Sequence, residues 1–338
     1  MTFKEPIATG HRGTKLSTSA ICPISRRKSF KQIAFGVAGL ALCGTHSQPL
    51  SGEKTKMPEK DGGHYVDAHV HVWTNDLQRY PLAAGFTRQD MNPPNFSPEE
   101  IRRHATPCGV NRIILVQMSY YGYDNSYLLD TLRQSPQVFR GIAVVDWKSG
   151  APDVEMRKLA KQHIRGFRIS PGGPADVEQL EGESFHRMLR CGAEENLAMC
   201  FLINPDVLPV VNRICRKFPD SPVIIDHLAR IGMDGAIRDA DVRALCALAK
   251  YPKTKVKVSA FYALGKKKPP HLDLAPFIRR VYDAFGPKRL MWGSDCPFQL
   301  MKETYADSFD LVRYHLDFLS SEDREWMLRR TAEEFFFD

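Results

Sequence analysis

Two histidines, His69 and His71, lie two residues apart in the stretch Val66-Asp67-Ala68-His69-Val70-His71-Val72. Side chains alternate across a β-strand, so a strand here would direct both imidazoles to one face. The valines around them favour a strand. Two neighbouring imidazoles could share a metal ion or polarise a substrate group, but paired histidines also occur simply as polar strand ends.

Short apolar strands alternate with amphipathic helices from residue 64 onward. We expect eight strands, at residues 65–70, 112–116, 139–145, 164–169, 198–203, 223–225, 255–258 and 289–292. We expect helices between them at 98–105, 126–133, 154–161, 184–195, 209–218, 241–250 and 275–285, and two more at 305–319 and 322–336. This rhythm predicts an α/β fold, a (β/α)8 TIM barrel. A doubly wound sheet is the alternative, but no GxGxxG motif follows the first strand.

Polar residues follow the expected strands at the end where barrel enzymes place their catalytic groups. Seven strands contribute such residues, and their coincidence is harder to explain structurally than any one of them. After the two histidines of the first strand, they are Gln117, Arg168, Asn204, Asp226, His227, Ser259 and the run Gly293-Ser294-Asp295. We expect Asp67, within the first strand, to have a structural role.

Four of these patterns together resemble the amidohydrolase superfamily, in particular its second amidohydrolase-related family. They are Val66-Asp67-Ala68-His69-Val70-His71, Gly166-Phe167-Arg168, Val223-Ile224-Ile225-Asp226-His227 and Trp292-Gly293-Ser294-Asp295-Cys296-Pro297. The stretch from Val116 to Ser126 resembles the branch that contains 2-pyrone-4,6-dicarboxylate lactonase and the sugar-lactone hydrolases. The resemblance runs from about residue 64 to the C-terminus and implies a metallo-dependent hydrolase-like barrel.

The sequence departs from the family pattern at the end of the fifth strand. Metal-dependent members carry a histidine there, whereas this chain has Asn204, whose amide is a poorer zinc ligand. The resemblance leaves His69, His71 and Asp295 as metal ligands, with His227 near them. It implies one divalent ion, zinc or manganese, or a metal-independent site, because some members of the branch work without metal.

The resemblance implies hydrolysis of a lactone. Asp295 is our candidate general base, and His69, His71 and His227 would polarise the carbonyl, directly or through a metal. Arg168 would orient a substrate carboxylate. For the other candidates a structural role is equally open; they are Gln117, Tyr120, Asn125, Arg230, Ser259 and Tyr262.

Three further points concern the substrate and the reaction. Tyr262 stands roughly where the lactonase branch has an arginine, so a monocarboxylate or neutral lactone is as plausible as a dicarboxylate. A metal-dependent, non-oxidative decarboxylase of an aromatic or unsaturated acid is the second reading. A non-catalytic ligand-binding barrel is the third. Each would act on a small molecule.

The net charge of +8 belongs mainly to the N-terminal tail. Residues 1–60 contain ten Lys and Arg against three Asp and Glu, and the remainder contains 37 against 36. The barrel therefore has no basic surplus, which argues against nucleic-acid binding. Eight scattered cysteines without a CxxC pair give no disulfide framework.

The tail itself resembles a twin-arginine export signal. Ser25-Arg26-Arg27-Lys28-Ser29-Phe30-Lys31 precedes the apolar run from Ile33 to Leu42, which is too short to span a bilayer. We expect a signal segment over residues 1–46, a linker over 47–63 and the barrel over 64–338. The protein would then be periplasmic or otherwise extracytoplasmic, with no stable transmembrane span after signal removal.

At the C-terminus, we expect the run Phe335-Phe336-Phe337 to dock on the barrel or on a neighbouring subunit of a homo-oligomer.

Overall fold

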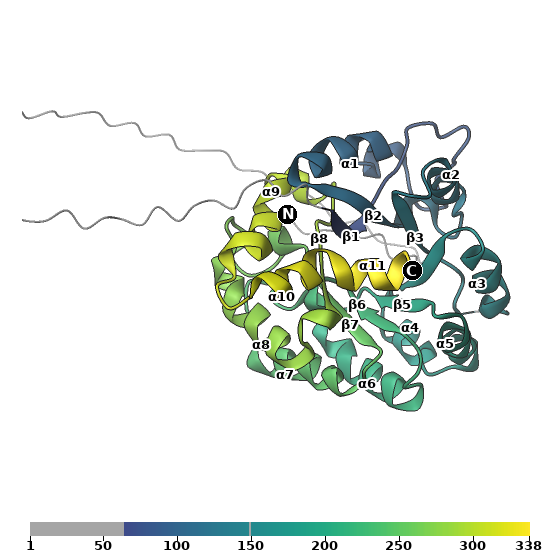
Figure 1. Ribbon diagram of the computed structural model, residues 1–338. Coiled ribbons are helices and arrows are strands. Elements are labelled where there is room, and N and C mark those ends of the chain that lie inside the picture. Colours follow the sequence, from purple (N-terminus) through teal and green to yellow (C-terminus); the bar gives the residue numbers. More distant parts are fainter. Residues whose placement is uncertain (1–63, 149) are drawn as a thin grey trace, which may run out of the picture. The chain divides into compact units, whose positions relative to one another are not determined.

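Eight parallel strands follow one another around a barrel in the order in which they occur in the chain (Figure 1). The structure is a computed structural model that describes residues 64–148 and 150–338, so the expected signal segment and linker lie outside the described residues. The strands are β1 Tyr65–Val70, β2 Val110–Val116, β3 Phe139–Ala143, β4 Ile164–Ile169, β5 Ala198–Phe201, β6 Val223–Ile225, β7 Thr254–Ser259 and β8 Leu290–Gly293. The predicted (β/α)8 barrel is confirmed, and each predicted strand overlaps an observed one.

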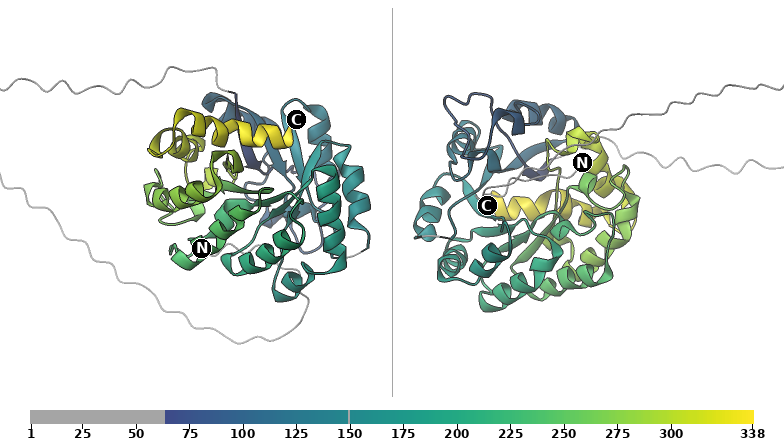
Figure 2. Two further views of the ribbon diagram at one scale, coloured as in Figure 1. Left: turned by 60° about the horizontal axis from the view of Figure 1, so that its bottom comes forward. Right: turned by 180° about the vertical axis from the view of Figure 1, so that it is seen from behind.

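A ring of helices surrounds the strands, as the two further views in Figure 2 show. The helices are α1 Pro98–Ala105, α2 Ser126–Gln134, α3 Pro152–Ala160, α4 Pro174–Gln179, α5 Glu183–Glu195, α6 Leu208–Lys217, α7 Asp239–Cys246, α8 Ala275–Phe285, α9 Tyr305–Asp310, α10 Ser321–Glu325 and α11 Thr331–Phe336. Their apolar faces pack on the sheet; α8, for example, buries Phe277, Ile278, Val281 and Phe285. The short helix α4 was not predicted. Among the described residues, no helix is long and apolar enough to cross a membrane.

The barrel closes where the first strand meets the last. Val70 forms a parallel bridge with Cys296, and two backbone hydrogen bonds of 2.8 Å flank it, from Asp295 N to His69 O and from His71 N to Cys296 O. The Asp67 carboxylate adds a third link, because its Oδ1 accepts the backbone N–H of Ser294 at 2.9 Å. The closing contacts therefore involve the same short segments that carry the candidate site residues.

The C-terminal helix α11 covers the end of the barrel at which the strands begin, opposite the end that carries the candidate site residues (Figure 1). Phe335 and Phe336 pack with interior residues of the strands, among them Val66 and Ile114. The guanidinium groups of Arg112 and Arg140, near the starts of β2 and β3, lie over the Phe337 ring. The expected docking of the C-terminal phenylalanines is thus onto the barrel of the same chain.

Asp67 is fully buried and holds three donors at the closure. Besides Ser294 N, it accepts the backbone N–H of His69 at 3.1 Å and the Tyr305 hydroxyl at 2.8 Å. Burial raises the pKa of Asp67 to about 6, although the hydrogen bonds from Ser294, His69 and Tyr305 oppose that rise.

We expect Asp67→Ala to lower the free energy of unfolding by about 3–5 kcal/mol, because three buried donors lose their acceptor. Chemical denaturation at pH 7 measures this change. Asp206→Ala, at an exposed aspartate, is the control and should change stability by less than about 0.5 kcal/mol. A loss below about 1 kcal/mol in Asp67→Ala would show that the closure does not depend on this carboxylate.

Candidate functional site

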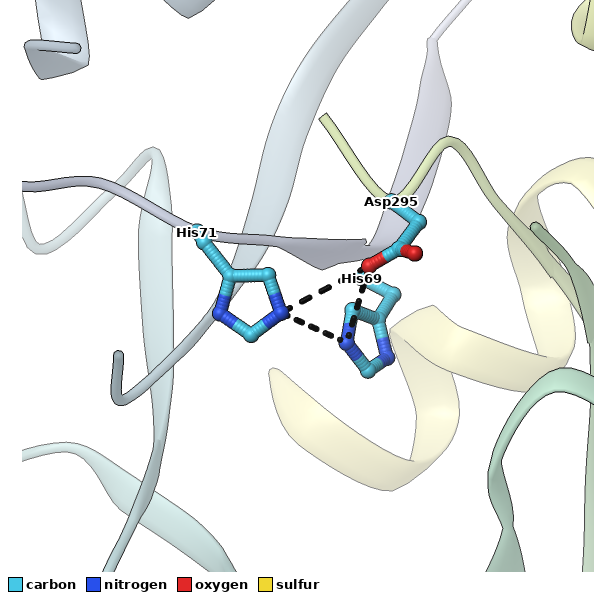
Figure 3. A group of neighbouring side chains, drawn as sticks. All are labelled: His69, His71 and Asp295. Atoms are coloured by element: carbon cyan, nitrogen blue, oxygen red, sulfur yellow. Dashed lines mark hydrogen bonds and ion pairs between the residues drawn. The ribbon is translucent and has the colours of Figure 1, made fainter. Parts of the chain in front are cut away.

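His69, His71 and Asp295 converge at the C-terminal end of the barrel, at the junction of β1 and β8 (Figure 3). The Nε2 atoms of the two histidines are 3.2 Å apart, and each lies 3.5 Å from Asp295 Oδ1. His227 approaches the same oxygen, with its Nε2 at 3.8 Å. All four side chains are buried, so one carboxylate oxygen is surrounded by three imidazoles largely shielded from water.

An irregularity in β1 directs His69 inward. The pairing of β1 with β2 shifts register between Asp67 and Val70. Ala68 packs in the barrel interior and the next side chain, His69, also reaches the site, whereas Asp67 bonds to Tyr305 on the outer helix α9. Strict alternation would have put Asp67 and His69 on one face, so the bulge separates their roles.

His227 and Asp295 both have left-handed backbone conformations, with φ of 52° and 63°. His227 begins a run of four such residues that ends at Arg230, directly after β6. This conformation costs L-residues roughly 1–2 kcal/mol each and persists where surrounding contacts enforce it. The two turns bring His227 Nε2 to within 3.8 Å of Asp295 Oδ1.

Gly293, the last residue of β8, allows the first strand to come close. A Cβ atom at this position would lie 2.9 Å from His69 Cβ and 3.0 Å from His69 N. Any larger residue would push His69 away from Asp295, which gives the glycine of the Gly293-Ser294-Asp295 run a steric reason.

A buried group of charges lies behind the histidines. Lys257 on β7 places its Nζ 3.1 Å from His69 Nδ1 and 3.1 Å from Asp226 Oδ1. Arg168 lies 3.7 Å from Asp226 Oδ2 and 3.4 Å from His71 Nε2. Lys257 was not among the predicted site residues, although it precedes Ser259 by two residues and so shares its face of the strand. Asp226 was noted there only as a strand end.

Burial keeps two of the histidines neutral. It lowers the pKa of His227 to about 4, although the Asp295 charge opposes this. Burial, together with the positive charge of Lys257, holds the pKa of His69 well below its ordinary value. At neutral pH both rings are therefore available as neutral donors or acceptors.

Asp295 is ionised despite its burial. Burial by itself raises the pKa of its carboxyl, but the neighbouring His227, His71 and His69 lower it by more. The Tyr262 hydroxyl donates to Oδ2 at 2.6 Å, which leaves Oδ1 for the three histidines. Tyr262, predicted as a substrate contact, therefore contacts the candidate base in this structure.

Three other predicted substrate contacts form hydrogen bonds to the backbone of the loops that follow β1, β2 and β3. Gln117 Nε2 donates to Asp124 O at 2.6 Å, and Tyr120 OH donates to Asp90 O at 2.7 Å. Asn125 forms two hydrogen bonds with the backbone of Val144. Its Nδ2 donates to Val144 O at 2.9 Å, and its Oδ1 accepts from Val144 N at 3.0 Å. These bonds shape the loops, and the substrate-binding role of the three residues stays a prediction.

The remaining candidates are Ser259, which contacts His227, and Arg230. Ser259 is fully buried, and its Oγ is 2.9 Å from His227 Nδ1. Arg230 is partly exposed and its Nε lies 3.1 Å from the Met233 sulfur. Asn204, which follows β5 and whose amide is a poor zinc ligand, is exposed.

The positions and the chemical types of His69, His71 and Asp295 suit a divalent metal ion. One ligand atom from each of His69, His71 and Asp295 lies within 4.8 Å of the others, and all three residues are buried. Two imidazoles and one carboxylate are ordinary ligands for zinc. The three residues predicted as ligands therefore form a group that could hold a metal ion.

Comparisons with known proteins agree with this architecture. Residues 66–337 match a family model described as Amidohydrolase. An L-fucono-1,5-lactonase from Burkholderia ambifaria is 28% identical over 72% of this chain and 83% of its own length. A 4-sulfomuconolactone hydrolase from Rhizobium radiobacter is 24% identical over 68% and 75%. The crystal structure of a zinc-bound amidohydrolase from Burkholderia multivorans has the same fold, with a TM-score of 0.66 and 21% identity over 81% of this chain and 99% of that one.

The lowered pKa of His227 makes a prediction about acid stability. The folded ring takes up a proton only near pH 4, whereas an unfolded histidine does so near pH 6.5. Between these values the unfolded state binds more protons, so the contribution of His227 to the free energy of unfolding rises with pH. We expect the difference in this free energy between wild type and His227→Gln to grow by about 3 kcal/mol from pH 4 to pH 6.5.

Denaturant titrations of both proteins across this range measure that difference. The raised pKa of Asp67 gives an opposite slope in the same range, but it is common to both proteins and cancels. A difference that does not vary with pH would mean that His227 titrates normally in the folded protein.

Proposed function

The chain belongs to the amidohydrolase family, and we propose that it opens the ring of a lactone of a small carboxylic or sugar acid, with Asp295 activating the attacking water. The observation that carries the proposal is an ionised Asp295 whose Oδ1 lies within 3.8 Å of three imidazole rings. The names of the two relatives aligned above, a lactonase and a lactone hydrolase, support the same class of reaction.

The proposed reaction needs one base and at least one hydrogen-bond donor. Water attacks the lactone carbonyl carbon while Asp295 Oδ1 takes its proton. The tetrahedral intermediate then breaks the ring C–O bond, and the leaving oxygen takes the proton from Asp295. The products are a carboxylic acid and a hydroxyl on the same molecule.

Ring N–H groups can stabilise the negative charge that develops on the carbonyl oxygen. His227 Nδ1 accepts from the Ser259 hydroxyl in the arrangement that best suits the site, because a lone pair on Nε2 would face the Asp295 carboxylate. Its Nε2–H then points into the site. Because the pKa of Asp295 is low, Asp295 is a weak base, and stabilisation of the oxyanion and placement of the water must supply much of the rate.

Ser259, His227 and Asp295 also resemble a nucleophilic triad, but their arrangement does not fit one. Ser259 is fully buried behind the His227 ring, on the side away from Asp295. A nucleophile must reach the substrate carbon. We therefore assign Ser259 to the orientation of His227 and the attack to water.

Arg168 is the strongest candidate for binding a substrate carboxylate. Its guanidinium is largely buried, and its Nε has no hydrogen-bond partner among the described residues. A buried, unpartnered donor beside the reacting groups suits an anionic group of the substrate. When bound, a zinc ion held by His69, His71 and Asp295 would polarise the carbonyl and acidify water.

The first test is hydrolysis of a panel of sugar-acid and carboxylated lactones, followed by proton release. We expect Asp295→Asn to lower kcat at least 10³-fold, because the amide cannot accept the proton of water. Asp206→Ala is the control and should retain full activity. Turnover retained in Asp295→Asn would refute the assignment of the base. Release of carbon dioxide from aromatic acids would instead support the decarboxylase, and binding without turnover would support the ligand-binding barrel.

Tyr262→Phe separates a role in supporting the base from a role in binding substrate. Loss of the hydrogen bond to Asp295 Oδ2 should lower kcat about tenfold, the equivalent of about 1.4 kcal/mol, and leave KM unchanged. Steady-state kinetics on the best lactone of the panel measures both constants. A rise in KM with unchanged kcat would return Tyr262 to the predicted role of a substrate contact.

A further inference from the structure

Lys257 determines which nitrogen of His69 carries the hydrogen. Its side chain is completely buried, and its ammonium nitrogen hydrogen-bonds to His69 Nδ1 at 3.1 Å. An ammonium group can only donate, so Nδ1 must accept. The hydrogen of the neutral His69 ring then lies on Nε2, the atom that faces His71 and Asp295.

The neighbouring hydrogen bonds agree with this assignment. His71 Nδ1 lies 2.9 Å from Val116 O, a carbonyl that can only accept, so this nitrogen carries the hydrogen of His71. His71 Nε2 faces His69 Nε2 at 3.2 Å and Asp295 Oδ1 at 3.5 Å, so Val116 fixes the orientation of the ring from its other side.

The charges of the site balance without a metal ion. Seven histidine, arginine, lysine and aspartate residues are linked by contacts of 3.8 Å or less, namely His69, His71, Arg168, Asp226, His227, Lys257 and Asp295. Among them, the two carboxylates of Asp226 and Asp295 face the two cationic side chains of Lys257 and Arg168, so these four charges sum to zero. A divalent cation would leave two positive charges uncompensated in a buried place, which is energetically costly.

We propose that Lys257 is a positioning residue that holds His69 as a hydrogen-bond donor and thereby keeps the His69, His71 and Asp295 group weak for divalent metals. A metal ligand must offer the lone pair of Nε2, which here carries the hydrogen. The proposal concerns metal affinity and holds whether or not the substrate is a lactone.

The structure also indicates what Lys257 prevents. Asp226 Oδ1 lies 3.6 Å from His69 Nδ1, and neither oxygen of Asp226 has a hydrogen bond among the described residues. Without the ammonium group, His69 Nδ1 could donate to Asp226, which frees Nε2. A carboxylate behind a histidine in this way strengthens metal binding by 10- to 100-fold in other sites.

Zinc titration of the purified full chain, in competition with a chromophoric chelator, tests the proposal. We expect Lys257→Met, which keeps the side-chain length, to bind one zinc ion at least tenfold more tightly than wild type. Adding Asp226→Asn to that variant should remove the gain. Lys255→Met is the matched control, because Lys255 lies on the same strand but over the Phe335 ring at the sealed end, and its affinity should equal that of wild type.

Equal zinc affinity in Lys257→Met and wild type, with circular dichroism showing that both are folded, would overturn the proposal. Nitrogen-15 spectra of the histidine rings in the wild type give a second measurement that needs no variant. They should show His69 with its hydrogen on Nε2. A hydrogen on Nδ1 would refute the inference even if Lys257→Met failed to fold.

Discussion

The site depends on one buried charge balance, that of Asp226 and Asp295 with Lys257 and Arg168. Isolated charges in a protein interior are prohibitively costly, so each must face an opposite one. Beside these charges, the three neighbouring histidines keep Asp295 ionised, and burial keeps the rings of His69 and His227 neutral. The histidines can then act through their hydrogen-bond direction instead of their charge, which suits a site that must stabilise an oxyanion.

The interior of the barrel has two chemically different parts. At the end sealed by α11, the strands present small and aliphatic side chains such as Val66, Ile114 and Ile224 to Phe336. Towards the other end the interior side chains become ionic with Lys257 and Asp226, and the histidines follow. The packed half supplies rigidity, and the ionic half is held in place by contacts of defined direction.

Much of this arrangement could be predicted from the sequence, because it follows from periodicity. The eight strands and the barrel follow from the alternation of apolar strands with amphipathic helices. The convergence of His69, His71, His227 and Asp295 follows from the polar residues at the strand ends. The buried residues that contact these side chains were harder to predict from the sequence. Lys257 lies in the run Thr-Lys-Val-Lys-Val-Ser, where Lys255 and Lys257 share a face and only the structure shows which end of the barrel each approaches. The roles of Tyr262 and Gln117 depend on loop conformations that residue types do not determine.

The closure between β1 and β8 has a consequence for the folding of the protein during its synthesis. His69 and His71 are among the first residues of the barrel to be synthesised, and Asp295 is among the last, so they are more than 200 positions apart. The contacts that complete the barrel are the same contacts that bring these residues together, and α11, which seals the far end, follows later still. Assembly of the site is thus tied to completion of the chain, and a truncated product lacks the site as well as the fold.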